Sequence, residues 1–415
     1  MLRHSAYYDF LASLDENTPV WTSTIAGLGV LSLIDAARED KSIIDADWTG
    51  VRTVTDQIEL IREGDPVRRT LMRIMDDLRG GGPNWSRVNH GLFAYGRALD
   101  IDGRWSLAVD VFDTVAEIAR ADREPQMAID ATTALGGSAR RSGDWDRSAE
   151  GYAEAAYLAD SIGDKASGLT VRVGTANTHI ARGNLPAAQL ILDEVIAEAS
   201  NAGLDGVLAL AQHDAGAVAY LQGRYAEAVP LFYKALERAT NPSVKDNIMS
   251  DLAGALFTMG MIDSARDAYL VSSMTARYQW VRWQSTINLM ELASFEGNAE
   301  AFDRYGRELT YAALDPRLRS YFLLFYGEGS LRLGRHEEGI RSIAEAKEFA
   351  TEHKIFQVAH DAERALVTGE KTARVAEAVS EWTARPIPEE VAQVVSALGS
   401  LRESTLRSPP VDEWQ

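Results

Sequence analysis

The sequence of 415 residues contains no cysteine, which removes several kinds of chemistry at once. Without thiols there is no disulfide framework, no thiolate metal site and no cysteine nucleophile. The first residues also lack the uninterrupted apolar stretch of a secretion signal, because Asp9 interrupts it. Both absences fit a reducing compartment, and we expect a cytoplasmic location.

Basic residues are scarce relative to acidic ones, and long apolar runs are missing. Lysine plus arginine total 42 against 61 aspartate plus glutamate, which gives a net charge of −19. A field of this sign repels phosphate backbones and anionic lipid surfaces, so we expect neither nucleic acid nor a membrane as partner. The best apolar run, Ile25 to Ile34, is shorter than the roughly 18 residues of a membrane span.

The remaining composition, 46% hydrophobic and 25% charged, is that of a globular chain with a sizeable core. Its main feature is one glycine-led phrase that returns seven times, at intervals of 40 and then 37 residues. A period of this length with helical hydrophobic spacing is typical of stacked helical hairpins. The seven turn glycines are Gly103, Gly143, Gly183, Gly223, Gly260, Gly297 and Gly334.

Each phrase has the same physical logic. The glycine ends the first helix in a left-handed conformation. Five residues later stands a small side chain, and four residues after that a bulky one fills the space between helices. A second small residue, such as Gly96, Gly136, Gly216 or Gly327, precedes the turn by seven residues. In the sixth phrase this register requires a turn one residue shorter, which pairs Ala301 with Tyr305.

This pattern resembles the tetratricopeptide repeat (TPR) over residues 86–366. The units are longer than usual and are similar to those of kinesin light chains and bacterial peptide-sensing regulators. The resemblance implies an all-α fold, a right-handed α-solenoid or superhelix of about seven TPR helical hairpins. It also implies that a ligand would lie along the inner face of the first helices.

The two ends of the chain have no clear repeat. Residues 1–85 predict an N-terminal helical bundle or divergent repeats, ending in a Gly-rich hinge. Its four helices are expected at 2–14, 21–38, 48–63 and 65–78. Residues 367–415 predict C-terminal helices that cap the solenoid, at 370–384 and 388–403, followed by a frayed tail.

Enzyme motifs are absent or incomplete. His336-Glu337 begins like a zinc-protease helix, but Ile340 stands where the second histidine must bind the metal. Glycine-rich phosphate loops and a nucleophile elbow are missing. We therefore expect a protein that is not an enzyme and uses no metal or cofactor. A helical toroid with two glycosidase carboxylates is the alternative, but it would not need the seven TPR-like turns.

Polar side chains fall on one stripe of the first helices. Arg97, Arg140, Asn177 and His213 occupy it in four consecutive repeats and could bind a carboxylate and a peptide backbone. The asparagine position resembles one that clamps a ligand backbone in related families. As the alternative, the two arginines pair with local acids such as Asp100 and Asp130. The same stripe carries Phe93, Tyr220 and Glu328.

The densest aromatic cluster of the chain is Tyr278, Trp280 and Trp283. Their helical spacing fits core packing, and the alternative is an exposed outer patch that binds a partner.

The sequence thus predicts a non-enzymatic scaffold or adaptor whose concave groove binds a protein or peptide segment. The alternative is a regulatory switch in which a peptide ligand in the groove repositions the N-terminal bundle. That alternative rests on a layout similar to the Rap family: a three-helix bundle, a linker helix and seven long repeats. No catalytic glutamine motif is matched in residues 1–78, and no basic helix-turn-helix is present. The oligomeric state is not predicted.

Overall fold

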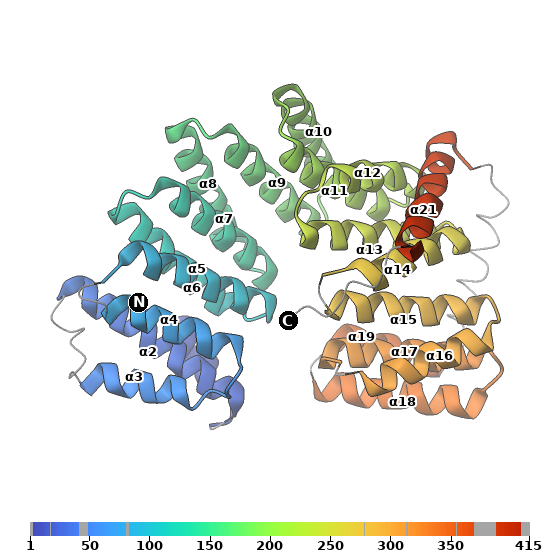
Figure 1. Cartoon of the computed structure of the whole chain (residues 1–415), viewed down its shortest axis with the longest axis horizontal. Coiled ribbons are helices and arrows are strands. Elements are labelled where there is room, and N and C mark those ends of the chain that lie inside the picture. The colour runs from blue at the N-terminus through green and yellow to red at the C-terminus, as the bar shows by residue number, and fades with distance from the viewer. Residues whose placement is uncertain are drawn as a thin grey trace. The chain divides into compact units, whose positions relative to one another are not determined.

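A computed structural model describes residues 3–16, 18–40, 49–79, 83–277, 279–312, 314–353, 355–368 and 387–407. Within these ranges every regular element is a helix (Figure 1), which confirms the all-α prediction. The predicted helix 370–384, the tail from 408 onward and Tyr278 lie outside the described residues.

The chain folds into two compact units, Met1–Ile191 (unit 1) and Leu192–Gln415 (unit 2). Unit 1 begins with α1 (Ser5–Ala12), α2 (Pro19–Glu39), α3 (Thr49–Glu59) and α4 (Pro66–Arg79). The predicted division into segments 1–85, 86–366 and 367–415 stays a prediction.

Seven helix pairs follow in chain order. In unit 1 they are α5 (Trp85–Ile101) with α6 (Trp105–Ala121), α7 (Pro125–Ser142) with α8 (Trp145–Ile162), and α9 (Lys165–Ala181) with α10 (Leu185–Ala202). The boundary between the two units falls within α10. In unit 2 they are α11 (Asp205–Leu221) with α12 (Tyr225–Arg238), α13 (Pro242–Thr258) with α14 (Ile262–Thr275), α15 (Gln279–Phe295) with α16 (Ala299–Tyr311), and α17 (Pro316–Arg332) with α18 (His336–Glu352). Two more helices, α19 (Phe356–Thr368) and α21 (Glu389–Arg407), complete it.

The turns between paired helices agree with the sequence pattern. All seven turn glycines, Gly103 to Gly334, have φ between 67° and 83°. Further left-handed residues join successive pairs at half the 40-residue spacing: Gly163, Gly203 and Arg123, which has φ 60°. Each 40-residue repeat is therefore two halves of equal length. Arg123 adopts a backbone that costs a non-glycine residue roughly 1 kcal/mol, and sequence inspection did not reveal that turn.

Small residues of the first helix face bulky residues of the second. A Cβ on each glycine would lie within 3 Å of a partner ring or branched side chain: Gly96 with Phe112, Gly136 with Tyr152, Gly216 with Phe232 and Gly327 with Ile343. Six of the seven pairs lie wholly within one unit, and their two helices pack on each other. This is the helical-hairpin architecture that the TPR resemblance implied.

Adding a methyl group at this contact is expected to destabilise unit 2. A Cβ on Gly216 would lie 2.7 Å from the ring of Phe232, which is 1% exposed and cannot move aside. We expect Gly216→Ala to lower the free energy of unfolding by about 1–3 kcal/mol, measured by urea denaturation. Gly206→Ala in the same helix is the control, because its Cβ would meet nothing within 4 Å. The control is expected to raise stability by about 0.4–1 kcal/mol, and equal losses in both variants would contradict the packing argument.

The sixth pair departs from the predicted register. Its turn is not shortened, because Asn298 caps α16 directly after Gly297. The position five residues after the glycine is therefore Phe302, which is fully buried, and Gly306 follows where a bulky side chain was expected. The predicted pairing of Ala301 with Tyr305 is wrong. In this pair the bulky residue, Phe302, comes first and the small residue, Gly306, follows four positions later.

The N-terminal helices share a single core with the first repeats. One hydrophobic cluster runs from Tyr7 through α2 and α4 to Leu135 on α7. The Tyr7 hydroxyl donates to the Tyr95 hydroxyl at 3.3 Å, and Gly27 leaves room for the Tyr95 ring. α2 is long and apolar enough to cross a membrane by length and composition, and 56% of that window is buried inside the protein.

The C-terminal helix α21 lies at a different place from the one predicted. It packs on α12 and α14, while α19 packs on α17 and α18 (Figure 1). Val391, Val394 and Leu398 are buried in the core of the α12–α14 region, and Arg402 donates to Asp267 at 2.8 Å. The expectation that this helix caps the open end of the solenoid is therefore corrected: α21 returns to second helices of earlier repeats.

Candidate functional site

The first helices of unit 1 form a groove of about 400 Å³. We call it the unit 1 groove. It gathers residues from α5, α7, α8 and α9, among them the predicted Phe93, Arg97 and Arg140. Its other lining residues are Ile129, Asp130, Thr133, Ala134, Gly137, Arg141, Tyr152, Ser167 and Thr170.

Glycine spacing sets the floor of the groove. The Tyr152 ring of α8 lies against Gly136 on α7 and Gly174 on α9, where a Cβ would overlap it. Phe93 packs on Phe112 with ring centroids 5.4 Å apart. The groove therefore has an aromatic floor held by small residues of the first helices.

Asp100 is the acid that neutralises one of the groove's arginines. It is 8% exposed, and its Oδ1 accepts hydrogen bonds from Ser138 Oγ at 2.7 Å and from Arg141 Nη2 at 2.5 Å. Arg97 is half exposed and stands 3.8 Å from the other Asp100 oxygen, at the outer limit of an ion pair. The sequence had suggested Asp100 as a partner for Arg97 and Arg140. In the structure its main partner is Arg141.

Arg140 makes no ion pair or side-chain hydrogen bond with any residue that the structure describes. Its Nε is buried without a partner. An unsatisfied buried donor of a charged group costs free energy that an incoming acceptor can recover. Arg140 is therefore the side chain in the groove that most needs an external anion or carbonyl.

Asp130 supplies the acidic side of the groove. Desolvation raises the pKa of its carboxyl, and the nearby charge of Asp164 adds to that effect. Gln126 donates to Asp130 at 3.2 Å and to Ser167 at 3.3 Å, which links α7 to α9. The groove thus combines cationic groups with a carboxyl group.

In unit 2 the predicted polar residues of α11 bridge to the next first helix. His213 Nε2 lies 2.8 Å from Asp251, and the Tyr220 hydroxyl lies 3.2 Å from Thr258. Burial lowers the pKa of His213, but the hydrogen bond to Asp251 and the charge of Asp214 outweigh it, so the net shift is upward. These two side chains tie neighbouring repeats together, and their role as ligand contacts stays a prediction.

The remaining predicted residues are scattered. Glu328 is 6% exposed and pairs with Arg332 at 3.4 Å, so it offers little surface to a ligand. Asn177 lies half-buried on α9. Trp280 is 48% exposed, whereas Trp283 packs on the core around α17. Trp283 is partly buried, Tyr278 lies outside the described residues, and the outer patch stays a prediction.

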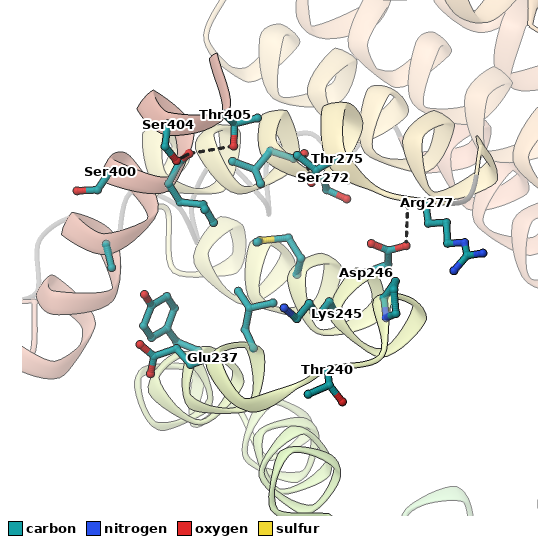
Figure 2. Close-up of a pocket in the computed structure, with 17 residues that line it drawn as sticks. Glu237, Thr240, Lys245, Asp246, Ser272, Thr275, Arg277, Ser400, Ser404 and Thr405 are labelled. Carbon is teal, nitrogen blue, oxygen red and sulfur yellow. Dashed lines mark hydrogen bonds between the residues drawn. The ribbon is translucent and has the colours of Figure 1, made fainter. Parts of the chain in front are cut away.

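A larger cavity of about 820 Å³ lies between α21 and the helices α12, α13 and α14 (Figure 2). We call it the α21 cavity. Leu236, Met249, Val271 and Leu401 give it an apolar lining. Asp246 accepts a hydrogen bond from the backbone N–H of Arg277 at 3.3 Å at one side of it. The sequence could not reveal this cavity, because it depends on where α21 docks.

In the described part of the chain no group of three histidine, aspartate or glutamate side chains is placed to hold a metal ion. The expectation that the protein needs no metal or cofactor stays a prediction.

Comparisons with known proteins give structural similarity alone. No family model and no curated protein matches the chain. Similar solved structures include the Cut9–Hcn1 hetero-tetramer of APC/C, at 10% identity and TM-score 0.49, covering 87% of this chain and 64% of that one. The apo quorum sensor NprR from B. thuringiensis follows at 12% identity and TM-score 0.41, covering 87% and 88%.

A Rap protein complexed with competence and sporulation factor is similar at 13% identity and TM-score 0.39, covering 92% of this chain and 99% of that one. All three TM-scores lie below 0.5. The fold assignment therefore rests on the helix pairs, turn glycines and small–bulky contacts of the chain itself.

Proposed function

We propose that the protein is a non-enzymatic adaptor whose unit 1 groove binds an extended segment of a partner protein. The segment presents a carboxylate to Arg97 and Arg140 and an apolar side chain to the aromatic floor. A guanidinium and a carboxylate form charge-assisted hydrogen bonds that are stronger than neutral ones. The expected partner is a protein or peptide, in the cytoplasm, and neither nucleic acid nor a membrane.

One observation carries this proposal: Arg140 lines the groove while its guanidinium has no partner among the described residues. Asp100, which could have satisfied it, is already bound by Arg141 and Ser138. Because its Nε is already removed from water in the free protein, that part of the desolvation cost does not recur when a ligand binds.

The core arrangement favours an adaptor over the switch that remains the alternative. A switch would have to move the N-terminal helices, yet Tyr7, α2 and α4 share one hydrophobic cluster with α5, α6 and α7. A rigid surface binds without that cost. Solution scattering with and without the captured peptide separates the two: an adaptor keeps its radius of gyration, and a switch contracts.

The charge-reversal variant Arg97→Glu/Arg140→Glu tests the groove. We expect it to lose partner binding by at least about 100-fold, because two attractive contacts become repulsive. Wild-type and variant proteins are used side by side to capture partners from the source lysate. Overlapping peptides of a captured partner are then titrated, with Asp and Glu replaced by their amides in each.

The matched control is Arg62→Glu/Arg182→Glu, which makes the same change of net charge at two exposed arginines outside the groove. It should retain the partner. If the groove variant and the control bind the same peptide equally well, the proposed site is wrong. Circular dichroism confirms that both variants keep their helices.

A further inference from the structure

A second cavity in unit 1 concentrates positive charge in an otherwise acidic protein. It has a volume of about 560 Å³ and lies between α4 and α5. We call it the α4–α5 cavity. Its cationic and titratable lining residues are Arg69, Arg73, Arg87 and His90, and no carboxylate is among its lining residues.

The arginines of this cavity are poorly neutralised. Arg69 and Arg73 are exposed and form no ion pair with any residue in the described ranges. Arg87 stands 3.8 Å from Asp77, at the limit of an ion pair. In a chain with a net charge of −19, three arginines clustered against so little acid form a local positive potential that needs an outside anion.

The backbone places these side chains where they can converge. Arg69 and Arg73 are one turn apart on α4, so they lie on the same face of that helix. Gly91 lets α5 approach, since a Cβ there would lie 2.7 Å from Ile74 of α4.

His90 has one ring nitrogen available to a ligand. Its Nδ1 lies 2.7 Å from the carbonyl oxygen of Ser86, and because a carbonyl only accepts, Nδ1 carries the hydrogen. Nε2 then either accepts a hydrogen bond or, when the ring is protonated, donates one. The cavity therefore offers three guanidinium groups and a histidine to one anion.

We propose that the α4–α5 cavity binds a phosphomonoester. Guanidinium groups match phosphate oxygens in bidentate geometry, and a phosphomonoester carries about two negative charges with three terminal oxygens at neutral pH. A carboxylate would use only part of this donor set. The volume exceeds that of a phosphate and lies in the ordinary range for sites that hold a whole small ligand or side chain, roughly 300–1,000 Å³.

This proposal does not rest on the function proposed for the unit 1 groove, because the two cavities share no lining residue. The first probe is inorganic phosphate, titrated into the full chain by calorimetry and by phosphorus NMR. We expect saturable binding that weakens as salt rises. Sulfate should compete and acetate should not.

Two double variants with the same loss of charge decide the assignment. Arg69→Gln/Arg73→Gln is expected to weaken phosphate binding by at least about tenfold. Arg62→Gln/Arg182→Gln changes exposed arginines outside the cavity and should leave it unchanged. Arg97→Glu/Arg140→Glu should also retain it, which separates a failure here from a failure of the groove proposal. Absence of phosphate binding, or equal weakening in both glutamine variants, would overturn the proposal.

The source of the phosphoryl group is read in a second pair of titrations. Free phosphoserine and a peptide that contains phosphoserine are compared, each with its unphosphorylated form. Equal affinity of the two phosphorylated probes indicates a free phosphomonoester as ligand. Tighter binding of the phosphopeptide indicates a phosphorylated segment of a partner. If phosphorylation changes the affinity of neither probe, the site does not recognise a phosphomonoester.

Discussion

Replacement of Arg332 by methionine is expected to lower the free energy of unfolding of unit 2 by about 3–5 kcal/mol, because it leaves buried carboxylates without their cation. Arg332 ends α17 and is 10% exposed as a side chain. Its Nη2 lies 3.4 Å from Glu328 and 3.7 Å from Glu291. Those two side chains are 7% and 16% exposed, so water cannot take the place of the arginine.

The same guanidinium joins two first helices by other contacts. Its Nη1 donates to Ser294 Oγ at 2.8 Å, and its central carbon lies 3.9 Å from the centroid of the Phe295 ring on α15. Burial lowers the pKa of Arg332, and the charges of Glu291 and Glu328 oppose that shift. Loss of the side chain therefore removes a hydrogen bond, a cation–π contact and the Glu291 ion pair between α15 and α17, together with the Glu328 ion pair within α17.

The double variant Arg332→Met/Glu328→Met is the control for this prediction. It exchanges a buried ion pair for apolar side chains, which is often close to neutral, so most of the lost stability should return. Protonation neutralises Glu291 and Glu328, so the loss of unfolding free energy in the single variant should become smaller as the pH falls. Urea denaturation at several pH values, with hydrogen exchange in α15 and α17, measures both effects. A loss below about 1 kcal/mol in the single variant would show that water reaches these acids.

Much of the fold could be predicted because its signal is local. A left-handed turn requires glycine in most cases, and a close helix contact requires a small residue opposite a bulky one. Both constraints return at a fixed period, so seven copies revealed them together. The register of the sixth pair was predicted wrongly because the bulky Phe302 stands at the position of the small residue and Gly306 at the position of the bulky one. The turn at Arg123 was not predicted, because an arginine gives no indication of a left-handed backbone.

The sites were predicted less well, because they depend on contacts distant in sequence. Helical spacing predicted that Phe93, Arg97 and Arg140 lie on one stripe of the first helices, and all three line the unit 1 groove. The spacing gave no sign that Arg141 would pair with Asp100. Arg69 and Arg73 belong to no sequence motif that indicates a site. They line one cavity with Arg87 because α4 packs on α5. The position of α21 likewise depends on contacts distant in sequence, between its residues Val391, Val394 and Leu398 and the core of the α12–α14 region.

His4 joins three parts of unit 1. Its Nδ1 lies 2.7 Å from Asp110 on α6, and its Nε2 lies 2.9 Å from Asp35 on α2. Since both acceptors are carboxylates, both ring nitrogens donate and the imidazole is positively charged. Burial lowers the pKa of His4, but the hydrogen bonds to Asp110 and Asp35 outweigh it and raise the pKa to about 9.

A histidine whose folded pKa exceeds its unfolded value of 6.5 contributes stability that is complete below pH 6.5 and is lost as the pH rises through about 9. We expect His4→Asn to lower the free energy of unfolding by about 2–3 kcal/mol below that window, with allowance for partly exposed carboxylates. Asparagine tolerates the left-handed backbone of this residue, φ 58°. The variant therefore reports the charge and its hydrogen bonds rather than backbone strain.

Wild type and variant should converge above pH 9, because neutral His4 can no longer donate to both acids. Urea denaturation across this pH range, with hydrogen exchange in α1, α2 and α6, measures the difference. The control is His353→Asn, which removes an exposed histidine that contacts Phe349 and should change stability by less than about 0.5 kcal/mol. A deficit in His4→Asn that is the same on both sides of the window would mean that His4 acts by packing and not by its charge.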